Sequence, residues 1–290
     1  MHKDNMAQDS LTLPQLLTTR EVAELLRVKE RKVYDMAAAG EIPHRRLTGK
    51  LLFPADEIST WISGERGPRP SVVGGSHDPL LDWAIRESGC GLSVLLGGSM
   101  DGLRRFQAGE VALAGMHVST GDDWNLEVVR DAVVAGAVLI GWAQRSQGLI
   151  LSDHSAKSVG GIADLAGRKL VLRQAGAGSR LLFDRLAAES ELTVAADALV
   201  VRTENEAAEA VSSGEAEAAL GLEAAARAFG LRFVPLVIEN FDLLVDRRSY
   251  FTEAVQALLS FAAMPEFKDK AAKLGGYELE GLGAVRWLSR

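Results

Sequence analysis

Residues 74–81 read GGSHDPLL and residues 97–104 read GGSMDGLR, so the chain uses nearly the same pattern twice. Each copy follows a short apolar run, at 71–73 in the first case and at 92–96 in the second. Glycine allows a sharp turn of the backbone, and serine and aspartate are common N-caps of helices. The two copies therefore predict two strand-to-helix loops in one sheet.

The rest of the chain after residue 71 alternates between strand-like and helix-like segments. We expect strands at 71–73, 91–96, 111–114, 133–142, 169–173, 198–201, 218–220, 233–237 and 241–245. We expect helices at 79–88, 102–108, 161–165, 179–189, 205–213, 222–229, 252–264 and 265–274. This alternation predicts an α/β domain with a parallel sheet that helices cover on both faces. In such sheets ligands bind beyond the carboxyl ends of the strands.

Two more loops have the same character as the repeated pattern. RQAGAGSR, at 173–180, leads from an apolar strand into a helix, and AGMH, at 114–117, ends another strand. Backbone N–H groups and the dipole at a helix N-terminus favour anions. RQAGAGSR lacks the ending of a nucleotide phosphate loop and the glycine spacing of a dinucleotide fingerprint. The four loops together predict one site for a small anion or polar ligand.

A different pattern fills residues 17–62. A threonine followed by Glu21 predicts a capped helix, with Val22, Leu25 and Leu26 as its apolar face. We expect a tight turn at 27–28 and a second helix over 29–39, which Gly40 ends. Residues 42–53 read as a hairpin, and a closing helix starts at 54–58 and ends near 63–64.

Positive charge is concentrated in this first segment. Residues 20–50 contain eight Lys or Arg and five Asp or Glu, a local charge of +3. The whole chain carries −7, so the remainder carries −10 by difference. A basic module on an acidic body is typical of local contact with nucleic acid.

The first segment resembles the excisionase and MerR-type winged helix-turn-helix family. The resemblance depends on TTREVAELLRVKERKVYDMAAAGEIPHRR and GKLLFPADEISTWI. It implies that the second helix enters the major groove of double-stranded DNA and that the wing touches the phosphates. The DNA-facing residues would be Lys29, Arg31, Lys32 and Tyr34 on the helix, with Arg45, Arg46 and Lys50 on the wing.

The remainder resembles the type II periplasmic-binding-protein fold, as found behind helix-turn-helix modules. The motifs are GSHDPLL, GGSMDGL, LAGMHV, LVLRQAGAGSR and GEAEAALGLEAAA. The resemblance implies two lobes joined by two crossovers. Asn240 and Asp242 lie at the second crossover, where formation of a turn is favoured over ligand binding. The expected domains are 1–64, a Gly/Pro-rich linker at 65–71, and 72–290. Lobe one would comprise 72–142 and 238–290, and lobe two 143–237.

Relatives of this kind attached to molybdopterin-biosynthesis proteins imply molybdate or tungstate as the ligand, with a small organic acid as the alternative. A tetrahedral dianion needs several donors but no full counter-charge. His77 and Asp78 either contact the ligand or only cap a helix. The expected ligand-binding residues are Ser76, His77, Ser99, His117, Gly178, Ser179, Arg180 and Glu223.

Other classes of function have weaker support in the sequence. No Ser-His-Asp order with a nucleophile elbow occurs, so we expect no catalytic residues. A dehydratase or lyase on the same fold is the enzyme alternative, and its acid–base pair would be His117 with Glu223. The five histidines lack metal-ligand spacing, so we expect neither metal nor cofactor. The single cysteine, Cys90, is expected to be buried and inert.

The sequence shows no segment that would carry the chain to a membrane. It contains no run of ~20 apolar residues, the length that a membrane span needs, and its first residues lack the apolar core of a signal peptide. We therefore expect a cytoplasmic transcriptional regulator. A single small reader binds DNA weakly, so a homo-oligomer, dimer or tetramer, on an inverted-repeat operator is expected.

Overall fold

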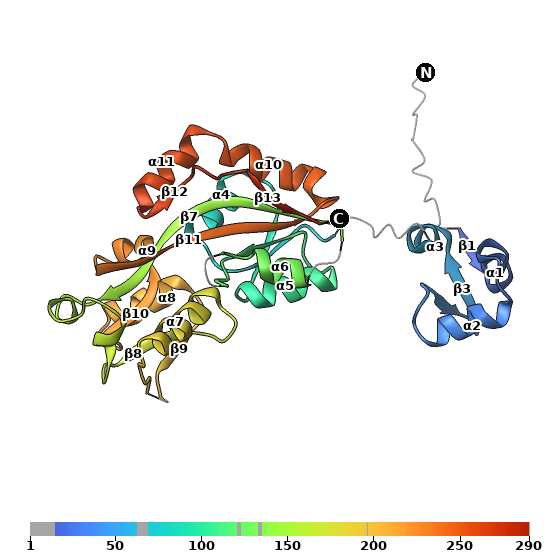
Figure 1. Cartoon of the computed structure of the whole chain (residues 1–290). Helices are drawn as coiled ribbons and strands as arrows, with labels where there is room; N and C mark the ends of the chain where they lie inside the picture. Colours follow the sequence, from blue (N-terminus) through green and yellow to red (C-terminus); the bar gives the residue numbers. More distant parts are fainter. Residues whose placement is uncertain (1–14, 63–68, 121–122, 133–134, 196, 290) are drawn as a thin grey trace, which may run out of the picture. The chain divides into compact units, whose positions relative to one another are not determined.

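The computed structural model describes residues 15–62, 69–120, 123–132, 135–195 and 197–289. The chain divides into two compact units, residues 1–67 and residues 68–290 (Figure 1). Most of the predicted linker, 65–71, lies outside the described residues.

The first unit combines three helices with a small antiparallel sheet of strand order β1-β3-β2. The helices are α1 (Thr19–Leu26), α2 (Glu30–Ala38) and α3 (Ala55–Ile62), and the strands are β1 (Leu16–Thr18), β2 (Arg45–Leu47) and β3 (Lys50–Pro54). The predicted helices and wing hairpin are thereby confirmed. Strand β1 was not predicted, because its three residues carry too short a pattern.

Local sequence signals explain the ends of the first two helices. The Thr18 side chain accepts from the backbone N–H of Glu21 at 3.3 Å, and the Glu21 carboxylate accepts from the backbone N–H of Thr18 at 2.7 Å. This is the reciprocal capping box that the sequence predicted. Arg27, with a φ of 55°, ends α1 in the left-handed conformation, and Gly40, with a φ of 70°, follows α2.

The core of the first unit corrects one sequence prediction. Val22 is fully buried, but Leu25 is 54% exposed. The buried arc of α1 instead contains Thr19 and Ala23. At 100° per residue, Leu25 lies on the other side of Val22 from this arc, so it points to solvent. Leu25 is therefore not part of the apolar face.

The second unit is built on one mixed sheet of strand order β5-β4-β6-β11-β7-β10-β8-β9, with β12 and β13 also paired to β7. Its strands are β4 (Val72–Gly75), β5 (Ser93–Leu96), β6 (Leu113–Met116), β7 (Ala137–Leu151), β8 (Leu170–Arg173), β9 (Leu199–Val201), β10 (Ala218–Leu222), β11 (Arg232–Asp246), β12 (Tyr277–Glu278) and β13 (Val285–Leu288). The strands flanking the centre are parallel, as predicted, whereas β7 and β11 run antiparallel to each other.

The two long central strands, β7 and β11, differ from the crossovers that the sequence predicted. The sequence predicted separate strands at 233–237 and 241–245, but β11 is continuous, and Asn240 and Asp242 lie inside it rather than in a turn. Irregularities at 235–237 and 241–242 interrupt the side-chain alternation and made one strand look like two. The predicted lobe boundaries, after residues 142 and 237, fall within β7 and β11.

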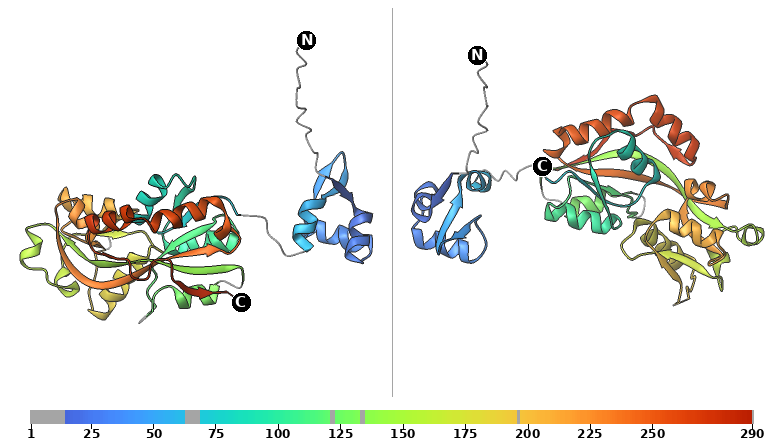
Figure 2. Two further views of the ribbon diagram at one scale, coloured as in Figure 1. Left: turned by 90° about the horizontal axis from the view of Figure 1, so that it is seen from above. Right: turned by 180° about the vertical axis from the view of Figure 1, so that it is seen from behind.

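Helices cover both sides of this sheet and define two lobes (Figures 1 and 2). Lobe one contains β4–β6, β12 and β13 with α4 (Pro79–Glu87), α5 (Ser99–Ala108), α6 (Leu126–Ala132), α10 (Glu253–Ala262) and α11 (Pro265–Leu274). Lobe two contains β8–β10 with α7 (Gly178–Glu189), α8 (Glu204–Ser212) and α9 (Glu223–Ala228). Strands β7 and β11 run through both lobes. Helix α6 was not predicted, and the helix expected at 161–165 is a single 3-10 turn, Ile162–Leu165.

Each lobe has apolar clusters on both faces of the sheet. In lobe one, α4, α10 and α11 pack on one face and α5 with α6 on the other. In lobe two, α7 packs on one face and α8 with α9 on the other. Cys90 is buried in the first of these clusters, as predicted. Within the described residues, no helix is long and apolar enough to cross a membrane.

Candidate ligand site between the lobes

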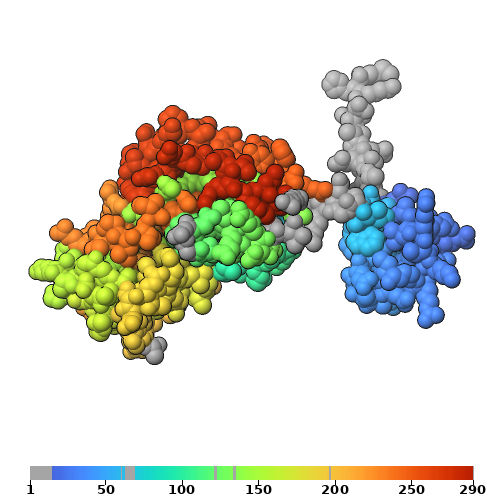
Figure 3. All heavy atoms as spheres, viewed as in Figure 1, coloured from blue at the N-terminus to red at the C-terminus, as the bar shows by residue number. Residues whose placement is uncertain are grey.

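Helices α5 and α7 begin next to each other, although they belong to different lobes. The backbone N–H of Met100, in α5, donates to the carbonyl of Gly176, before α7, at 3.2 Å. A Cβ placed on Gly98 would lie 3.1 Å from the Cα of Ala177. In the space-filling view, the yellow part of lobe two adjoins the green part of lobe one (Figure 3). The predicted loops of the two lobes therefore meet at one place.

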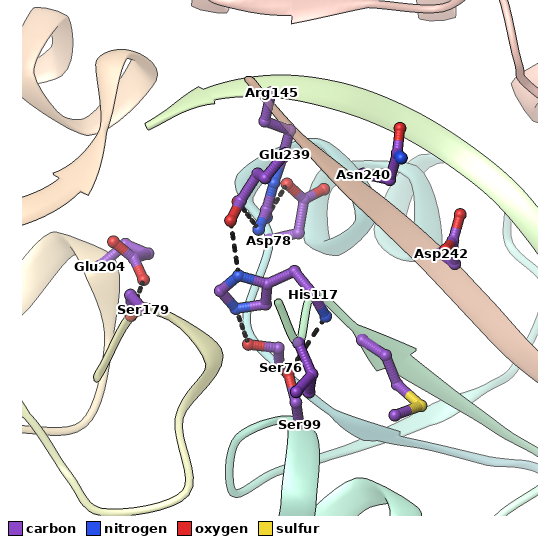
Figure 4. Close-up of polar contacts among 12 residues, drawn as sticks. Ser76, Asp78, Ser99, His117, Arg145, Ser179, Glu204, Glu239, Asn240 and Asp242 are labelled. Carbon is purple, nitrogen blue, oxygen red and sulfur yellow. Dashed lines mark hydrogen bonds and ion pairs between the residues drawn. The ribbon is translucent and has the colours of Figure 1, made fainter. Parts of the chain in front are cut away.

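His117 lies at the centre of this region, directly after β6. Its Nε2 lies 2.7 Å from the Ser76 hydroxyl, and its Nδ1 lies 2.9 Å from the Glu239 carboxylate (Figure 4). The Ser99 hydroxyl accepts from the backbone N–H of His117 at 3.2 Å. Serine hydrolases use the same order of groups. Here, however, the serine is buried and the carboxylate is shared with Arg145, so the arrangement resembles a fixed hydrogen-bonded relay.

Arg145 joins this relay to the start of α4. It forms ion pairs with Glu239 and, at 2.9 Å, with Asp78. Asp78 also accepts from the backbone N–H of Leu81 at 2.6 Å and from the Tyr277 hydroxyl at 2.7 Å. Asp78 is therefore both the N-cap of α4 and the anchor of a buried arginine.

Arg145 and Glu239 hold each other in their charged forms. Burial alone would lower the pKa of Arg145, but Glu239 and Asp78 outweigh burial and raise it above its ordinary value. Burial alone would raise the pKa of Glu239, but Arg145 and His117 outweigh burial and keep it below its ordinary value. Burial also raises the pKa of Tyr277, so this hydroxyl stays a donor.

Lobe two contributes a second buried ion pair, between Arg173 and Glu204. The Ser179 hydroxyl donates to the same Glu204 carboxylate at 3.2 Å. Ser179 is therefore engaged with an anion of the protein itself. Burial lowers the pKa of the neighbouring His77 and favours its neutral form.

Several buried polar atoms around the cluster lack a hydrogen-bond partner among the described residues. They include Nδ1 of His77, both amide atoms of Gln147 and Oε2 of Glu204. Gln147 and Glu204 are at most 1% exposed. An unmatched buried polar group is costly, so each of these atoms is a candidate to bind a polar ligand.

The predicted ligand residues fall into two groups. Ser76, Ser99 and His117 are in direct contact, and Gly178 packs against His117. Arg180 instead binds Asp184 at 2.8 Å and the carbonyl of Arg173 at 3.2 Å. Glu223 pairs with Arg227 and packs near Gly276. His117 therefore has Glu239 as its acidic partner, rather than the Glu223 of the enzyme alternative.

Sequence reasoning missed several members of this cluster. Glu239, Arg145 and Gln147 lie in the two central strands, and only their burial and pairing mark them. Nothing in the sequence linked Arg145 to residues 78 and 239. Glu204 lies just before the helix predicted at 205–213, and no pattern in the sequence marked it. A charged residue within an apolar strand was the one signal available for Arg145 and Glu239.

A separate cavity of about 380 Å³ lies at the same two strands. Asp242 lines it, receives a hydrogen bond from Asn125 at 2.7 Å and pairs with Arg286. Burial raises the pKa of Asp242 to about 6, although Asn125 and Arg286 oppose the rise. Metal-binding groups of three or more His, Cys, Asp or Glu do not occur among the described residues.

The predicted DNA-contacting residues are all exposed in the first unit. Lys29 precedes α2, and Arg31, Lys32 and Tyr34 lie on it. Arg45, Arg46 and Lys50 lie on the β2–β3 hairpin, where Glu57 holds Arg45 at 2.7 Å. Thr48 and Gly49, both with positive φ, form the hairpin turn.

Comparisons with known proteins agree with both units. A family model described as a PBP superfamily domain matches residues 83–263, and one described as a helix-turn-helix domain matches residues 16–66. The chain is 24% identical over 302 residues to the uncharacterized protein YvgK of Bacillus subtilis (strain 168), covering 92% of this chain and 96% of that protein.

Two solved structures share the fold of the second unit. One is a putative phosphate ABC transporter substrate-binding protein from Clostridium perfringens with bound phosphate, at a TM-score of 0.50 and 14% identity, covering 74% of this chain and 99% of that one. The other is described as the tungstate ABC transporter from Geobacter sulfurreducens, at a TM-score of 0.50 and 12% identity, covering 70% and 97%. At these identities the likeness concerns the fold alone.

Proposed function

Because this chain belongs to the PBP superfamily and carries a helix-turn-helix domain at 16–66, we propose that it is a DNA-binding transcriptional regulator that responds to a small ligand. The observation that carries the proposal is the combination of two features. Exposed basic side chains lie on α2 and the hairpin, and unmatched buried polar atoms lie between the lobes of the second unit.

The DNA-binding part of the proposal rests on the first unit. Helix α2 would enter the major groove, where Arg31, Lys32 and Tyr34 reach base edges or phosphates. Arg46 and Lys50 of the hairpin would bind the phosphate backbone. Arg45 would contribute less, because Glu57 already holds its guanidinium. A homodimer or tetramer would place two readers on one inverted-repeat site.

For the ligand, we propose a small oxyanion, most concretely molybdate or tungstate. Helix α7 has no side-chain cap on its N-terminus, and Ser76 and Ser99 lie beside it around His117. Uncapped N–H groups and hydroxyls suit a tetrahedral anion. The second unit shares its fold with a protein named for tungstate, which agrees with this choice, but the choice does not depend on that likeness.

A small organic acid with an amino group is the second candidate. Glu204 favours it, because its Oε2 is buried and lacks a partner among the described residues. An ammonium group would satisfy such an oxygen, whereas an oxyanion would be repelled by it.

Regulation would follow from unequal binding of the ligand to two arrangements of the lobes. A ligand acts on DNA binding only to the extent that it prefers one arrangement. Since β7 and β11 join the lobes, a change in their relative orientation would be carried by these strands and passed to the spacing of DNA readers in the oligomer.

A thermal-shift screen of the full chain tests the proposed ligand. The panel contains molybdate, tungstate, sulfate, phosphate, formate, amino acids and aromatic carboxylates. A ligand at ~100 times its Kd adds about 2.7 kcal/mol to the stability of the folded state, which gives a readable shift. A shift with molybdate or tungstate supports the oxyanion sensor. A shift with amino acids alone replaces the ligand, and no shift with any compound contradicts a small-molecule sensor.

A further inference from the structure

We propose that an oxyanion enters this site together with one proton, and that His117 takes up that proton. The inference rests on the proposed function and concerns the form in which the ligand binds. Its basis is the direction of each hydrogen bond in the relay Glu239–His117–Ser76, whose two contacts measure 2.9 Å and 2.7 Å.

The direction of the first hydrogen bond is fixed by Glu239. Arg145 and His117 keep the pKa of this carboxyl below its ordinary value despite burial, so it is ionised and can only accept. Nδ1 of His117 must therefore carry a hydrogen. In a neutral imidazole the other nitrogen, Nε2, is then an acceptor.

The direction of the second hydrogen bond follows. A serine hydroxyl has one hydrogen, and Ser76 donates it to Nε2 of a neutral His117. Ser76 then offers only lone pairs to any further group that approaches it. A fully ionised oxyanion also presents only lone pairs, so the two would repel each other. The relay in its neutral form is thus built for a donor, not for an anion.

One added proton reverses the hydrogen bond between Nε2 and Ser76 and leaves the one from Nδ1 to Glu239 unchanged, without moving a heavy atom. When His117 is protonated, Nε2–H donates to Ser76, and the hydroxyl hydrogen turns toward the ligand. The proton comes from a hydronium ion or a buffer acid, whose bond to that proton breaks as the N–H bond forms at Nε2. The imidazolium then donates to Glu239 from Nδ1 and to Ser76 from Nε2. The Ser76 hydroxyl then donates a hydrogen bond to the anion, and the positive charge of the imidazolium strengthens that bond. The repulsion between the anion and the lone pairs of Ser76 is removed.

The surrounding charges favour the same step. Glu239 faces the ring from β11, Arg145 lies behind Glu239 on β7, and Asp78 holds Arg145 from the start of α4. His77, in the same loop, is kept neutral by burial.

From lobe two, the N-terminus of α7 approaches the ring at Gly178, with the Glu204–Arg173 pair beyond it. The carboxylates of residues 78, 204 and 239 give −3 and the guanidiniums of residues 145 and 173 give +2, a net −1 that a protonated His117 brings to zero.

Isothermal titration calorimetry of the full chain with sodium molybdate tests the inference. Titrations at one pH in non-phosphate buffers of different ionisation enthalpy give the number of protons taken up for each molybdate bound. We expect close to one for the natural chain. Because one proton is taken up with each molybdate, we expect the affinity to fall as pH rises, by up to about tenfold for each pH unit.

Two variants separate a proton-carrying role from a structural one. His117→Gln is expected to bind molybdate more weakly, with no proton uptake and a flat pH profile. Glu239→Gln is expected to bind without proton uptake, because an amide donates to Nδ1 and leaves the hydrogen on Nε2 of a neutral ring. His154→Gln, at an exposed histidine, is the matched control and is expected to keep full uptake.

The outcomes distinguish failure of the proton-uptake inference from failure of the proposed oxyanion-sensing function. Binding of molybdate without proton uptake by the natural chain would overturn the inference and leave the oxyanion sensor intact. Unchanged proton uptake in the folded His117→Gln protein would show that another group takes up the proton, and this result would also overturn the inference. No binding of molybdate or of tungstate would overturn the proposed ligand itself, and the inference with it.

Discussion

Gly178 lies so close to His117 that a Cβ at position 178 would come within 2.4 Å of the His117 carbonyl oxygen and 2.8 Å of Nε2. The two residues belong to different lobes, Gly178 to the start of α7 and His117 to the end of β6. Only glycine permits this approach, because backbone atoms cannot yield as a flexible side chain would. The contact therefore reports directly on how closely the lobes can approach.

Gly178→Ala is expected to hold the lobes apart. The added methyl group would clash with His117, so the arrangement seen here would be destabilised while each lobe remains folded. We expect at least a tenfold loss of molybdate affinity in calorimetry and little change in melting temperature without ligand. Gly161→Ala is the matched control, since a Cβ there meets nothing within 4 Å. Equal affinities of the two variants would contradict this role of Gly178.

Arg145→Met is expected to destabilise the second unit strongly. The change leaves Asp78 and Glu239 buried without their cation, and loss of one partner from a buried pair costs about 3–5 kcal/mol. Urea unfolding followed by tryptophan fluorescence measures the loss. Arg86→Met, which removes an exposed partner of Asp82, is the comparison and should change stability by less than about 1 kcal/mol. A small effect of Arg145→Met would show that the cluster is solvated.

Asp242 predicts a pH dependence of stability. Burial raises its pKa from 3.8 to about 6, so the folded protein holds a proton here that the unfolded chain releases near pH 4. This contribution is fully present below about pH 4 and is lost as pH rises through 6. The linkage corresponds to roughly 3 kcal/mol.

Asp242→Asn isolates this contribution from those of other groups. The unfolding free energy of the natural chain, minus that of the variant, should fall by up to about 3 kcal/mol between pH 4 and pH 7. Glu239 gives the opposite trend, because its lowered pKa makes its contribution disappear as pH falls, and the subtraction cancels it. A flat difference would mean that Arg286 keeps Asp242 ionised throughout.

Replacing basic residues of the first unit is expected to weaken DNA binding without affecting the ligand. A binding site selected from random DNA serves as the target in fluorescence anisotropy. Arg31→Ala with Lys32→Ala should reduce affinity at least tenfold. Arg46→Ala should reduce the salt dependence of log K by about one, because one phosphate contact is lost. Lys157→Ala, an exposed lysine of the second unit, is the control, and an equal effect there would contradict the assignment.

The sequence predicted the first unit almost completely because its signals are local. The Thr18–Glu21 cap, the left-handed turn at Arg27 and the Thr48–Gly49 hairpin each need only a few neighbouring residues. Leu25 was wrongly predicted to be buried. Three apolar residues in one short helix do not define which part of the helix surface packs against the core.

The candidate site was predictable only where it lies in strand-to-helix loops. Ser76, Ser99 and His117 follow strands that end at one edge of the sheet, so their proximity follows from the topology. Their partner Glu239 is 122 residues from His117 in the chain and sits in a strand that the sequence divided in two. No local pattern records such a pairing, because the register between β6, β11 and β7 is set by packing of the whole sheet.

The most direct test of the account is the affinity for DNA with and without ligand. Anisotropy titrations of the selected DNA site would be run with the natural chain, without and with saturating molybdate. Molybdate should change the Kd for DNA by a factor of about 5–150 in either direction, and DNA should change the Kd for molybdate by the same factor. Gly178→Ala should lose the effect. If molybdate binds and the DNA affinity stays the same, the two units are not coupled and the chain is not a regulator that responds to this ligand.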